Sequence, residues 1–388
     1  SNGPVLLRSA RSLPEDDAVS MVLVRQEGTS TEDLLRQLQD DLRILSAEPN
    51  YVQRLDDPDQ TALDESTPQV AAALGLDSSD AAPSAPASAD ASGTAAADLS
   101  GYQWGCRNTG EVMVQEEAPP LAGFDIAPPN WNQVGTTNAA DVVAVVDTGV
   151  DYNHPDLNGI MCDMTQYTDR GGRYGINMDP TDPMDDNYHG THCAGIIASQ
   201  WDGVGTSGVA SGVQLVAVRV AGRQNTIESA DTIRAYEYLA EAVDAGLPLR
   251  AINNSWAGRT MSKAFSLAAT KLGEKGAVTV IGSGNDAADV DKIPMTASVL
   301  AHNPYAVAVD ASDSSGQLAS FSNYGVETTD VVAPGMNIMS TVPLGRAAYA
   351  PEADGSPLSY ETFESDAPSV TARATPTSSE DIDAVVQG

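Results

Sequence analysis

Short apolar runs alternate with amphipathic stretches in the part of the chain that follows residue 102. Residues 229–245 and 261–272 carry apolar side chains at helical spacing. Six other runs have the length and character of strands buried on both faces: residues 142–146, 214–220, 251–255, 277–281, 305–309 and 330–333. Strands that alternate with helices predict an α/β fold, a doubly wound parallel sheet with helices on both faces. In such sheets the functional residues lie at the carboxyl ends of the strands.

The first 55 residues predict a small α+β module ahead of this domain. Residues 19–24 have the pattern of a strand, and residues 47–52 have the pattern of a second one. Ser30 stands where a helix cap is expected. It precedes four leucines at helical spacing, Leu34, Leu35, Leu38 and Leu42. A module of this length is at the limit of independent stability.

Residues 56–100 predict a disordered acidic linker. They are rich in Ala, Ser, Asp and Pro and contain no aromatic residue. Such a composition buries too little apolar surface to order the chain; only residues 69–76 keep a helical alternative. We therefore expect a module at 1–55, a linker at 56–100 and the α/β domain at 101–388.

The charge balance excludes some classes of partner. The chain of 388 residues has 20 Lys and Arg against 54 Asp and Glu, a formal net charge of −34. Such a surface repels phosphate backbones and anionic lipids, which argues against nucleic-acid or membrane-surface binding. No apolar run approaches the roughly 18 residues that a membrane span requires. Three cysteines form at most one disulfide, which excludes a disulfide framework.

Asp147 directly follows the apolar run 142–146 and begins the motif Asp147-Thr148-Gly149. A carboxylate at the end of a buried strand is suited to orienting an imidazole. The same three residues occur in aspartic proteases, but those need a second such carboxylate. No second Asp-Thr-Gly or Asp-Ser-Gly follows an apolar run. A turn-forming Asp remains the alternative.

His189 opens a segment dense in Gly and Ala, which ends at residue 198. This composition predicts a closely packed apolar helix, and an imidazole at its start is a candidate general base. His189, His192 and Cys193 also have the spacing of a zinc cluster, although zinc requires a further ligand. A pair of buried structural histidines is the third interpretation.

Asn285 follows another predicted strand, in the text Gly282-Ser283-Gly284-Asn285. A side-chain amide aimed at a developing oxyanion accelerates acyl transfer by roughly 10²–10³-fold. A turn-forming Asn is the alternative for this motif taken alone.

Together the ordered motifs resemble the peptidase domain of the subtilisin-like serine proteases, the subtilases. The matching stretches are VVAVVDTGVDYNHPDL, HGTHCAGIIAS, NNSWAG, GSGN and VVAPGMNIMSTV. The resemblance implies a serine endopeptidase in which Asp147 orients the base, His189 is general base and acid, and Asn285 donates to the oxyanion. It further implies that one segment pairs with the substrate backbone and forms a wall of the enzyme's main specificity pocket. This segment consists of Ser255, Trp256, Ala257 and Gly258.

The resemblance also implies calcium, a propeptide and a secretory location. Asp156 and Asp202 match positions of family calcium ligands, and hard oxygen ligands suit Ca²⁺. Residues 47–52 (AEPNYV) match the end of a subtilase propeptide, which acts as intramolecular chaperone and inhibitor. We expect a monomer that acts on protein or peptide substrates, either secreted or in a secretory organelle. The chain itself contains no signal-peptide pattern, so we expect any such signal to lie ahead of it.

The family's nucleophile motif, Gly-Thr-Ser-Met-Ala-x-Pro, is missing. Glu364-Ser365-Asp366 stands where the motif belongs, between familiar flanks at 360–363 and 367–371. The apolar helix that should follow is also missing, and Pro376 would end a helix there. We expect a C-terminally incomplete peptidase domain. Two interpretations remain, a protease precursor that has lost the serine segment and an inactive homologue that binds peptides or regulates a partner.

Overall fold

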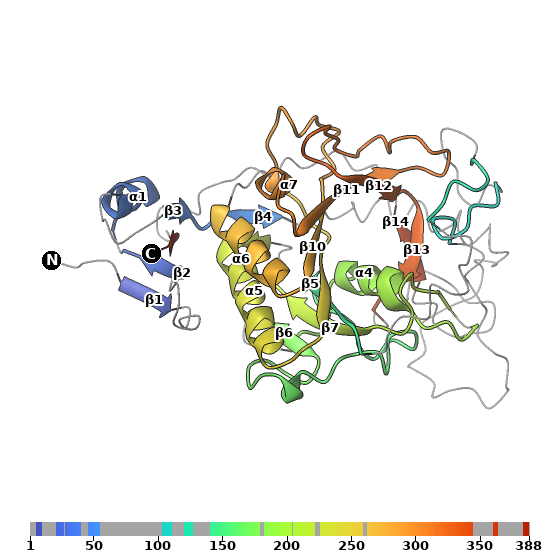
Figure 1. Ribbon diagram of the computed structural model, residues 1–388, viewed down its shortest axis with the longest axis horizontal. Coiled ribbons are helices and arrows are strands. Elements are labelled where there is room, and N and C mark those ends of the chain that lie inside the picture. The colour runs from blue at the N-terminus through green and yellow to red at the C-terminus, as the bar shows by residue number, and fades with distance from the viewer. Residues whose placement is uncertain are drawn as a thin grey trace, which may run out of the picture.

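The computed structural model describes residues 5–9, 21–26, 28–39, 46–54, 103–110, 120–126, 140–178, 182–203, 205–221, 226–258, 262–343, 360–363 and 383–387. The predicted linker 56–100 and Ser365 lie outside these residues. A seven-stranded sheet of order β12-β11-β10-β9-β5-β7-β6 forms the centre (Figure 1). Every pair of neighbours in it is parallel. Its strands are β5 Val142–Asp147, β6 Gly175–Asn177, β7 Gln214–Arg219, β9 Leu249–Asn254, β10 Val278–Gly282, β11 Ala306–Ser312 and β12 Val331–Pro334.

Helices cover both faces of this sheet (Figure 1). Alternate residues of β5 point to opposite faces. Ala144 and Val146 pack in one core with helices α5 (Ser229–Asp244) and α6 (Lys263–Glu274). Val145 packs in a second core with α4 (His189–Ala198). The expected doubly wound α/β fold is confirmed.

The strand order places β5 at the point where the chain changes direction across the sheet. β7 and β6 lie on one side of β5, and β9, β10, β11 and β12 lie on the other. Ligands of open α/β sheets bind at such a switch point, outside the carboxyl ends of the strands. Asp147 is the last residue of β5 and therefore lies at this edge.

The N-terminal module forms a separate four-stranded sheet of order β1-β2-β15-β3. Its elements are β1 Val5–Ser9, β2 Met21–Arg25, α1 Thr31–Gln39, β3 Ser46–Pro49 and, from the far end of the chain, β15 Asp383–Gln387. β15 lies antiparallel between β2 and β3. The sequence-based division assigned all of 101–388 to the α/β domain. In the structure, β15 of this range instead pairs with two strands of the N-terminal module. Val24, Leu34 and Leu38 form the module's small core.

The predicted elements agree with the observed ones apart from their ends. Ser30 caps α1, because its hydroxyl accepts a hydrogen bond from Asp33 N at 3.1 Å. The strand expected at 47–52 is interrupted: β3 ends at Pro49, and β4 (Val52–Arg54) pairs instead with β8 (Thr226–Glu228). Short elements without a clear pattern were not predicted, namely β1, β6, β8, β15, α7 (Thr296–Leu300), the 3₁₀ helix η2 (Met164–Gln166), β13 (Ile338–Thr341) and β14 (Tyr360–Phe363). Among the described residues, no helix combines the length and apolar character that crossing a bilayer requires.

Candidate active site

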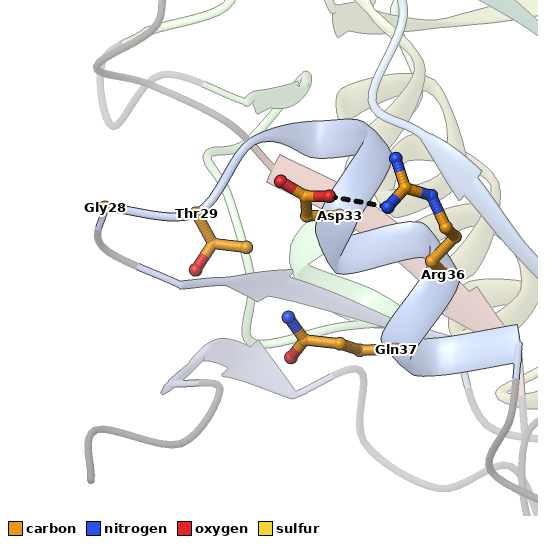
Figure 2. A pocket seen from close by; sticks show the side chains of 5 residues that line it. All are labelled: Gly28, Thr29, Asp33, Arg36 and Gln37. Carbon is orange, nitrogen blue, oxygen red and sulfur yellow. Dashed lines mark ion pairs between the residues drawn. The ribbon is translucent and has the colours of Figure 1, made fainter.

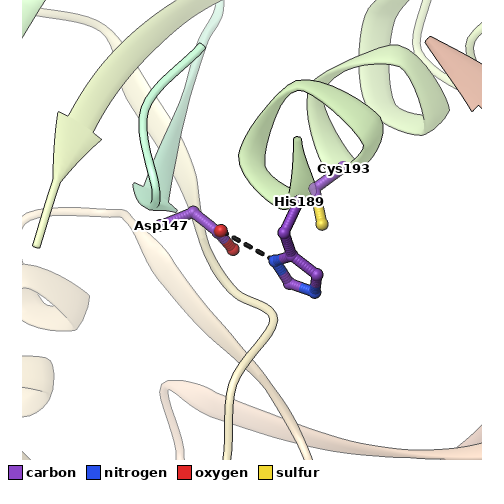
Figure 3. A group of neighbouring side chains, drawn as sticks. All are labelled: Asp147, His189 and Cys193. Carbon is purple, nitrogen blue, oxygen red and sulfur yellow. Dashed lines mark hydrogen bonds and ion pairs between the residues drawn. The ribbon is translucent and has the colours of Figure 1, made fainter. Parts of the chain in front are cut away.

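Asp147 and His189 meet at the carboxyl edge of the sheet (Figure 3). His189 Nδ1 lies 2.7 Å from Asp147 Oδ1. The carboxylate has no exposed surface, whereas the imidazole is 25% exposed. Asp147 Oδ1 also accepts from Thr148 N at 2.8 Å. A buried carboxylate therefore holds one ring nitrogen of an imidazole that solvent or a ligand can reach.

Close backbone contact brings the two elements together. Gly149 has a φ of +111°, and a Cβ there would lie 2.4 Å from Pro183 O. A Cβ on Gly190 would lie 2.1 Å from Gly149 O. Only glycine allows the start of α4 to approach the end of β5 this closely. The small residues around Asp147 and His189 are thus part of the geometry of the pair.

Cys193 lies one turn further along α4, beside the same pair (Figure 3). Ligand-type atoms of Asp147, His189 and Cys193 lie within 4.8 Å of one another. Burial, together with the nearby carboxylate of Asp147, raises the pKa of the Cys193 thiol well above its usual range. A buried thiol of this kind packs as a small apolar side chain. His192 does not join the group, because its Nε2 contacts Ile338 O at 3.0 Å, which argues against the zinc cluster of His189, His192 and Cys193.

Asn285 lies in the loop that follows β10, at the same edge of the sheet. Asn323 holds this loop. Its Oδ1 accepts from Asp286 N at 3.0 Å and from Ala288 N at 2.9 Å, and its Nδ2 donates to Ser283 O at 2.9 Å. Asn323 is fully buried. The sequence-based search for site residues missed it, because no local pattern links it to a loop about 35 to 40 positions earlier.

The segment 255–258 runs on from β9, between the ends of β5 and β10. The Trp256 indole is 5% exposed and donates to Val146 O at 2.9 Å. This side chain therefore belongs to the core beneath the site. Gly258 O accepts from Thr296 N at 2.7 Å and from its hydroxyl at 2.9 Å. Ser255 and Ala257 are partly exposed at the edge.

The two predicted calcium ligands are in different surroundings. Asp156 is buried, and its Oδ2 accepts from Thr206 N at 2.8 Å and from Thr206 Oγ1 at 3.1 Å. Asp202 is exposed in the same loop. Two further acidic residues before His189 have protein partners: Asp185 accepts from the Thr191 hydroxyl, and Asp186 pairs with Arg219. Asp156 is thus hydrogen-bonded to the loop that contains Asp202.

The region of the missing nucleophile begins next to the helix of His189. β13 packs against α4, where Ser340 Oγ donates to His192 O at 2.7 Å and Thr341 Oγ1 donates to Thr191 O at 2.8 Å. β14 pairs antiparallel with β13 and ends at Phe363. The residues that follow, Ser365 included, lie outside the described part of the chain.

A surface pocket lies in the N-terminal module, away from this edge (Figure 2). It is lined by Gly28, Thr29, Asp33, Arg36 and Gln37. The Arg36 guanidinium is paired with Asp33 at 2.8 Å and with Glu32 at 3.1 Å. Since this charge is already balanced by exposed neighbours, the pocket adds no chemistry to the site at Asp147.

Comparison with known proteins identifies the family. The model of the Subtilase family matches residues 139–378, more than half of the chain. A thermophilic serine proteinase of Bacillus sp. (strain AK1) is 35% identical over 234 residues, which cover 58% of this chain and 53% of that protein. Subtilisin E of Bacillus subtilis (strain 168) is 33% identical over 229 residues, which cover 59% of this chain and 55% of that protein.

The chain therefore spans about half the length of these two relatives. Among solved structures, a cold adapted subtilisin-like serine proteinase is similar at 27% identity and a TM-score of 0.48, covering 67% of this chain and 78% of that chain. Because the family model matches over most of the α/β domain, the chain belongs to the subtilase family.

Proposed function

We propose that this chain is the precursor of a subtilisin-like serine endopeptidase, a class that hydrolyses peptide bonds of proteins through an Asp-His-Ser triad, and that the serine segment has been lost from this sequence. The observation that carries the proposal is the 2.7 Å contact between His189 Nδ1 and the fully buried carboxylate of Asp147. This contact sits at the switch point of the sheet, where ligands of α/β folds bind.

In this proposal His189 Nδ1–H donates a hydrogen bond to Asp147 Oδ1, so the proton stays on Nδ1 and the lone pair resides on Nε2. Nε2 accepts the proton of a serine hydroxyl as its oxygen attacks the substrate carbonyl. The imidazolium so formed is stabilised by Asp147 and then protonates the leaving amine. Asp147 therefore fixes the tautomer and stabilises the transient positive charge.

Asn285 would donate to the oxyanion, and the segment 255–258 would pair with the extended substrate. Support for the first role is the position of Asn285, in a loop that Asn323 holds at the same edge of the sheet as Asp147. Such a donor contributes roughly 10²–10³-fold in rate. Support for the second role is the partly exposed course of Ser255 and Ala257 along the same edge. Because Trp256 is buried, we infer that it supports this segment from below.

The competing function is that of an inactive homologue that binds peptides or regulates a partner. The observation that favours it is the text Glu364-Ser365-Asp366 in place of the family's nucleophile motif. In subtilisin itself, loss of the serine alone costs about 10⁶-fold in kcat. We therefore expect the chain to have no detectable peptidase activity unless the serine segment is restored.

A fluorophosphonate probe, which labels activated serines covalently, tests this proposal. The unchanged chain is expected to remain unlabelled, whereas a variant with the Gly-Thr-Ser-Met-Ala motif and its apolar helix placed after Phe363 is expected to label. The control is the same variant with His189→Ala, which removes the base and should not label. Labelling of Ser365 in the unchanged chain would contradict the assignment of a lost nucleophile. A folded but unreactive restored chain would favour the inactive homologue.

We also infer that the loop 200–206 binds calcium with Asp156 and Asp202 as oxygen ligands. Support comes from the buried carboxylate of Asp156, which is already tied to this loop through Thr206. Carboxylate and carbonyl oxygens are the donors that Ca²⁺ prefers. Bound there, the ion would stabilise the loop and take no part in peptide hydrolysis.

The N-terminal module, we infer, acts as the chain's own propeptide and inhibitor. Support comes from its contacts with two helices of the α/β domain. Glu48 accepts from Lys263 N at 2.9 Å and from the Ser262 hydroxyl, at the start of α6. Asn50 accepts from Ala230 N at 2.9 Å, at the start of α5. Carboxylate and amide oxygens at helix N-termini satisfy N–H groups that the helix leaves unpaired.

Glu48→Ala is expected to loosen this docking. It removes a buried acceptor from the Lys263 amide, and hydrogen bonds to charged groups contribute about 1.5–3 kcal/mol. Exchange of the amides at 262–266 with deuterium, measured by mass spectrometry on the full chain, should accelerate by about 10- to 100-fold. Glu32→Ala, which removes an exposed carboxylate on α1, is the matched control and should leave these amides unchanged. Equal exchange in both variants would show that Glu48 does not hold the module in solution.

We further propose that the protein is a monomer that acts outside the cell or in a secretory organelle. Two observations support this proposal. The chain belongs to a family with secreted members, and it contains a propeptide-like module. Fractionation of cells that express the protein from its own gene tests this inference, and recovery from the cytosol alone would contradict it.

A further inference from the structure

Helix α4 begins without a side-chain cap of its own. Tyr188 occupies its N-cap position and makes no side-chain cap hydrogen bond. A helix start leaves its first N–H groups without intrahelical partners. Here they are bound from outside: Asn187 Oδ1 accepts from His189 N at 3.2 Å, and Thr148 Oγ1 accepts from Gly190 N at 2.8 Å. The position of His189 thus depends on side chains that precede the helix.

Asp185, another of the side chains that precede the helix, also binds the first turn of α4. It is 4% exposed, and its Oδ2 accepts from Thr191 N at 3.0 Å and from Thr191 Oγ1 at 2.6 Å. Its Oδ1 accepts from Asn187 N at 2.9 Å. Burial raises the pKa of Asp185, and the hydrogen bonds from Thr191 and Asn187 oppose this rise. The carboxylate is therefore tied to the first turn of α4 through Thr191 and to the segment before the helix through Asn187.

Thr148 is the residue directly after Asp147. Its hydroxyl accepts from Gly190 N at 2.8 Å, so it joins the end of β5 to the first turn of α4. A Cβ on Gly190 would lie 3.1 Å from Thr148 Oγ1, which leaves little space between the two elements. A shift of Asp185 or Thr148 therefore displaces His189 relative to Asp147.

We propose that Asp185 is a positioning residue for the Asp147–His189 pair: with Thr148, it fixes the start of α4 against the end of β5 and so sets the hydrogen bond between Asp147 Oδ1 and His189 Nδ1. The inference deepens the proposed function and rests on it for its catalytic meaning. Asp185 touches neither substrate nor reacting atoms; it acts through α4. Its removal is expected to weaken the bond between Asp147 and His189 while the sheet remains folded.

The test is proton NMR of the full chain with ¹⁵N-labelled histidine, well below the unfolding temperature. The chain has four histidines, and loss of one signal in His189→Gln assigns that of His189. In the unchanged chain the Nδ1 proton of His189 should give a far-downfield signal that exchanges slowly with water. Both carboxylate oxygens of Asp185 accept hydrogen bonds, from Asn187 N and from Thr191 N, whereas an amide has only one acceptor oxygen. In Asp185→Asn one of these partners loses its acceptor, and the His189 proton should exchange at least about tenfold faster. Signals of His154 and His302 should not move.

Two variants separate positioning from general stability. Thr148→Val removes the hydroxyl that joins the two elements and should reproduce the His189 effect if Asp185→Asn folds poorly. Asp186→Asn is the matched control, because this neighbouring carboxylate is half exposed and pairs with Arg219 instead; it should leave the signal unchanged. Folded Asp185→Asn and Thr148→Val chains with unchanged exchange at His189 would overturn the proposal. The measurement requires no nucleophile, so a restored chain that fails to label would reject the proposed function without deciding this outcome.

Discussion

In the chain with a restored nucleophile, Asp147→Asn is expected to lower kcat by about 10⁴-fold. The substitution keeps the shape of the side chain but removes its charge. Asp147 Oδ1 accepts from Thr148 N and from His189 Nδ1, so an amide placed there either loses one of these partners or imposes the wrong tautomer on the imidazole. The imidazolium would also lose its stabilising charge. Initial rates with a peptide substrate across a concentration series provide kcat and KM separately.

KM should change little in this variant, because Asp147 is fully buried and does not contact the substrate in the proposed mechanism. Asp141→Asn is the matched control. Asp141 lies just before the other end of the same strand, where it pairs with Arg250 at 2.8 Å, and its removal should leave kcat unchanged. A loss of less than about tenfold in kcat for Asp147→Asn would be incompatible with the role assigned to this carboxylate, since a triad without its Asp carboxylate is far slower.

Asn323→Leu is expected to destabilise the fold by at least about 3 kcal/mol. The new side chain has similar volume but cannot pair with Asp286 N, Ala288 N and Ser283 O, which the amide of Asn323 now satisfies. Each buried polar group left without a partner costs about 1–3 kcal/mol. Because these groups belong to the loop of Asn285, the loss should begin locally. Urea unfolding gives the stability, and deuterium exchange at 283–288 locates the change.

Asn303→Leu is the matched control for this substitution. Asn303 also makes side-chain hydrogen bonds, to Thr270 Oγ1 at 3.0 Å and from Tyr305 N at 3.0 Å, but it is only partly buried. Water can replace its partners, so we expect a loss of about 1 kcal/mol. If the two variants were equally stable, Asn323 would not hold the loop in the manner inferred from its hydrogen bonds.

Local patterns in the sequence were sufficient to identify most of the longer strands and helices of the α/β domain and the residues Asp147 and His189. The apolar run before Asp147 predicts a strand buried on both faces, and β5 ends at Asp147. The Gly- and Ala-rich text after His189 predicts a packed helix, and α4 begins at His189. These features are local, because burial and periodicity leave their mark within a few residues.

Contacts between distant residues could not be obtained in this way. The fully buried Asn323 resembles any loop asparagine in the sequence, and its partners lie 35 to 40 positions away. Glu48 contacts α6 across more than 200 positions. β15 pairs with β2 and β3, although the sequence suggested a single domain from 101 to 388. The burial of the Trp256 side chain beneath the site also depends on packing that its local sequence does not show.

By itself, the sequence determined which side chains are available for chemistry and which stretches become strands and helices, since both depend on short-range composition and periodicity. Only the tertiary structure decided that Asp147 and His189, 42 positions apart, lie 2.7 Å from each other. It also decided that the first turn of α4 donates to Thr148 through Gly190 N and to Asp185 through Thr191 N. The physical reason is that hydrogen-bond geometry and burial depend on how the sheet and helices pack, and no single segment of the chain carries that information.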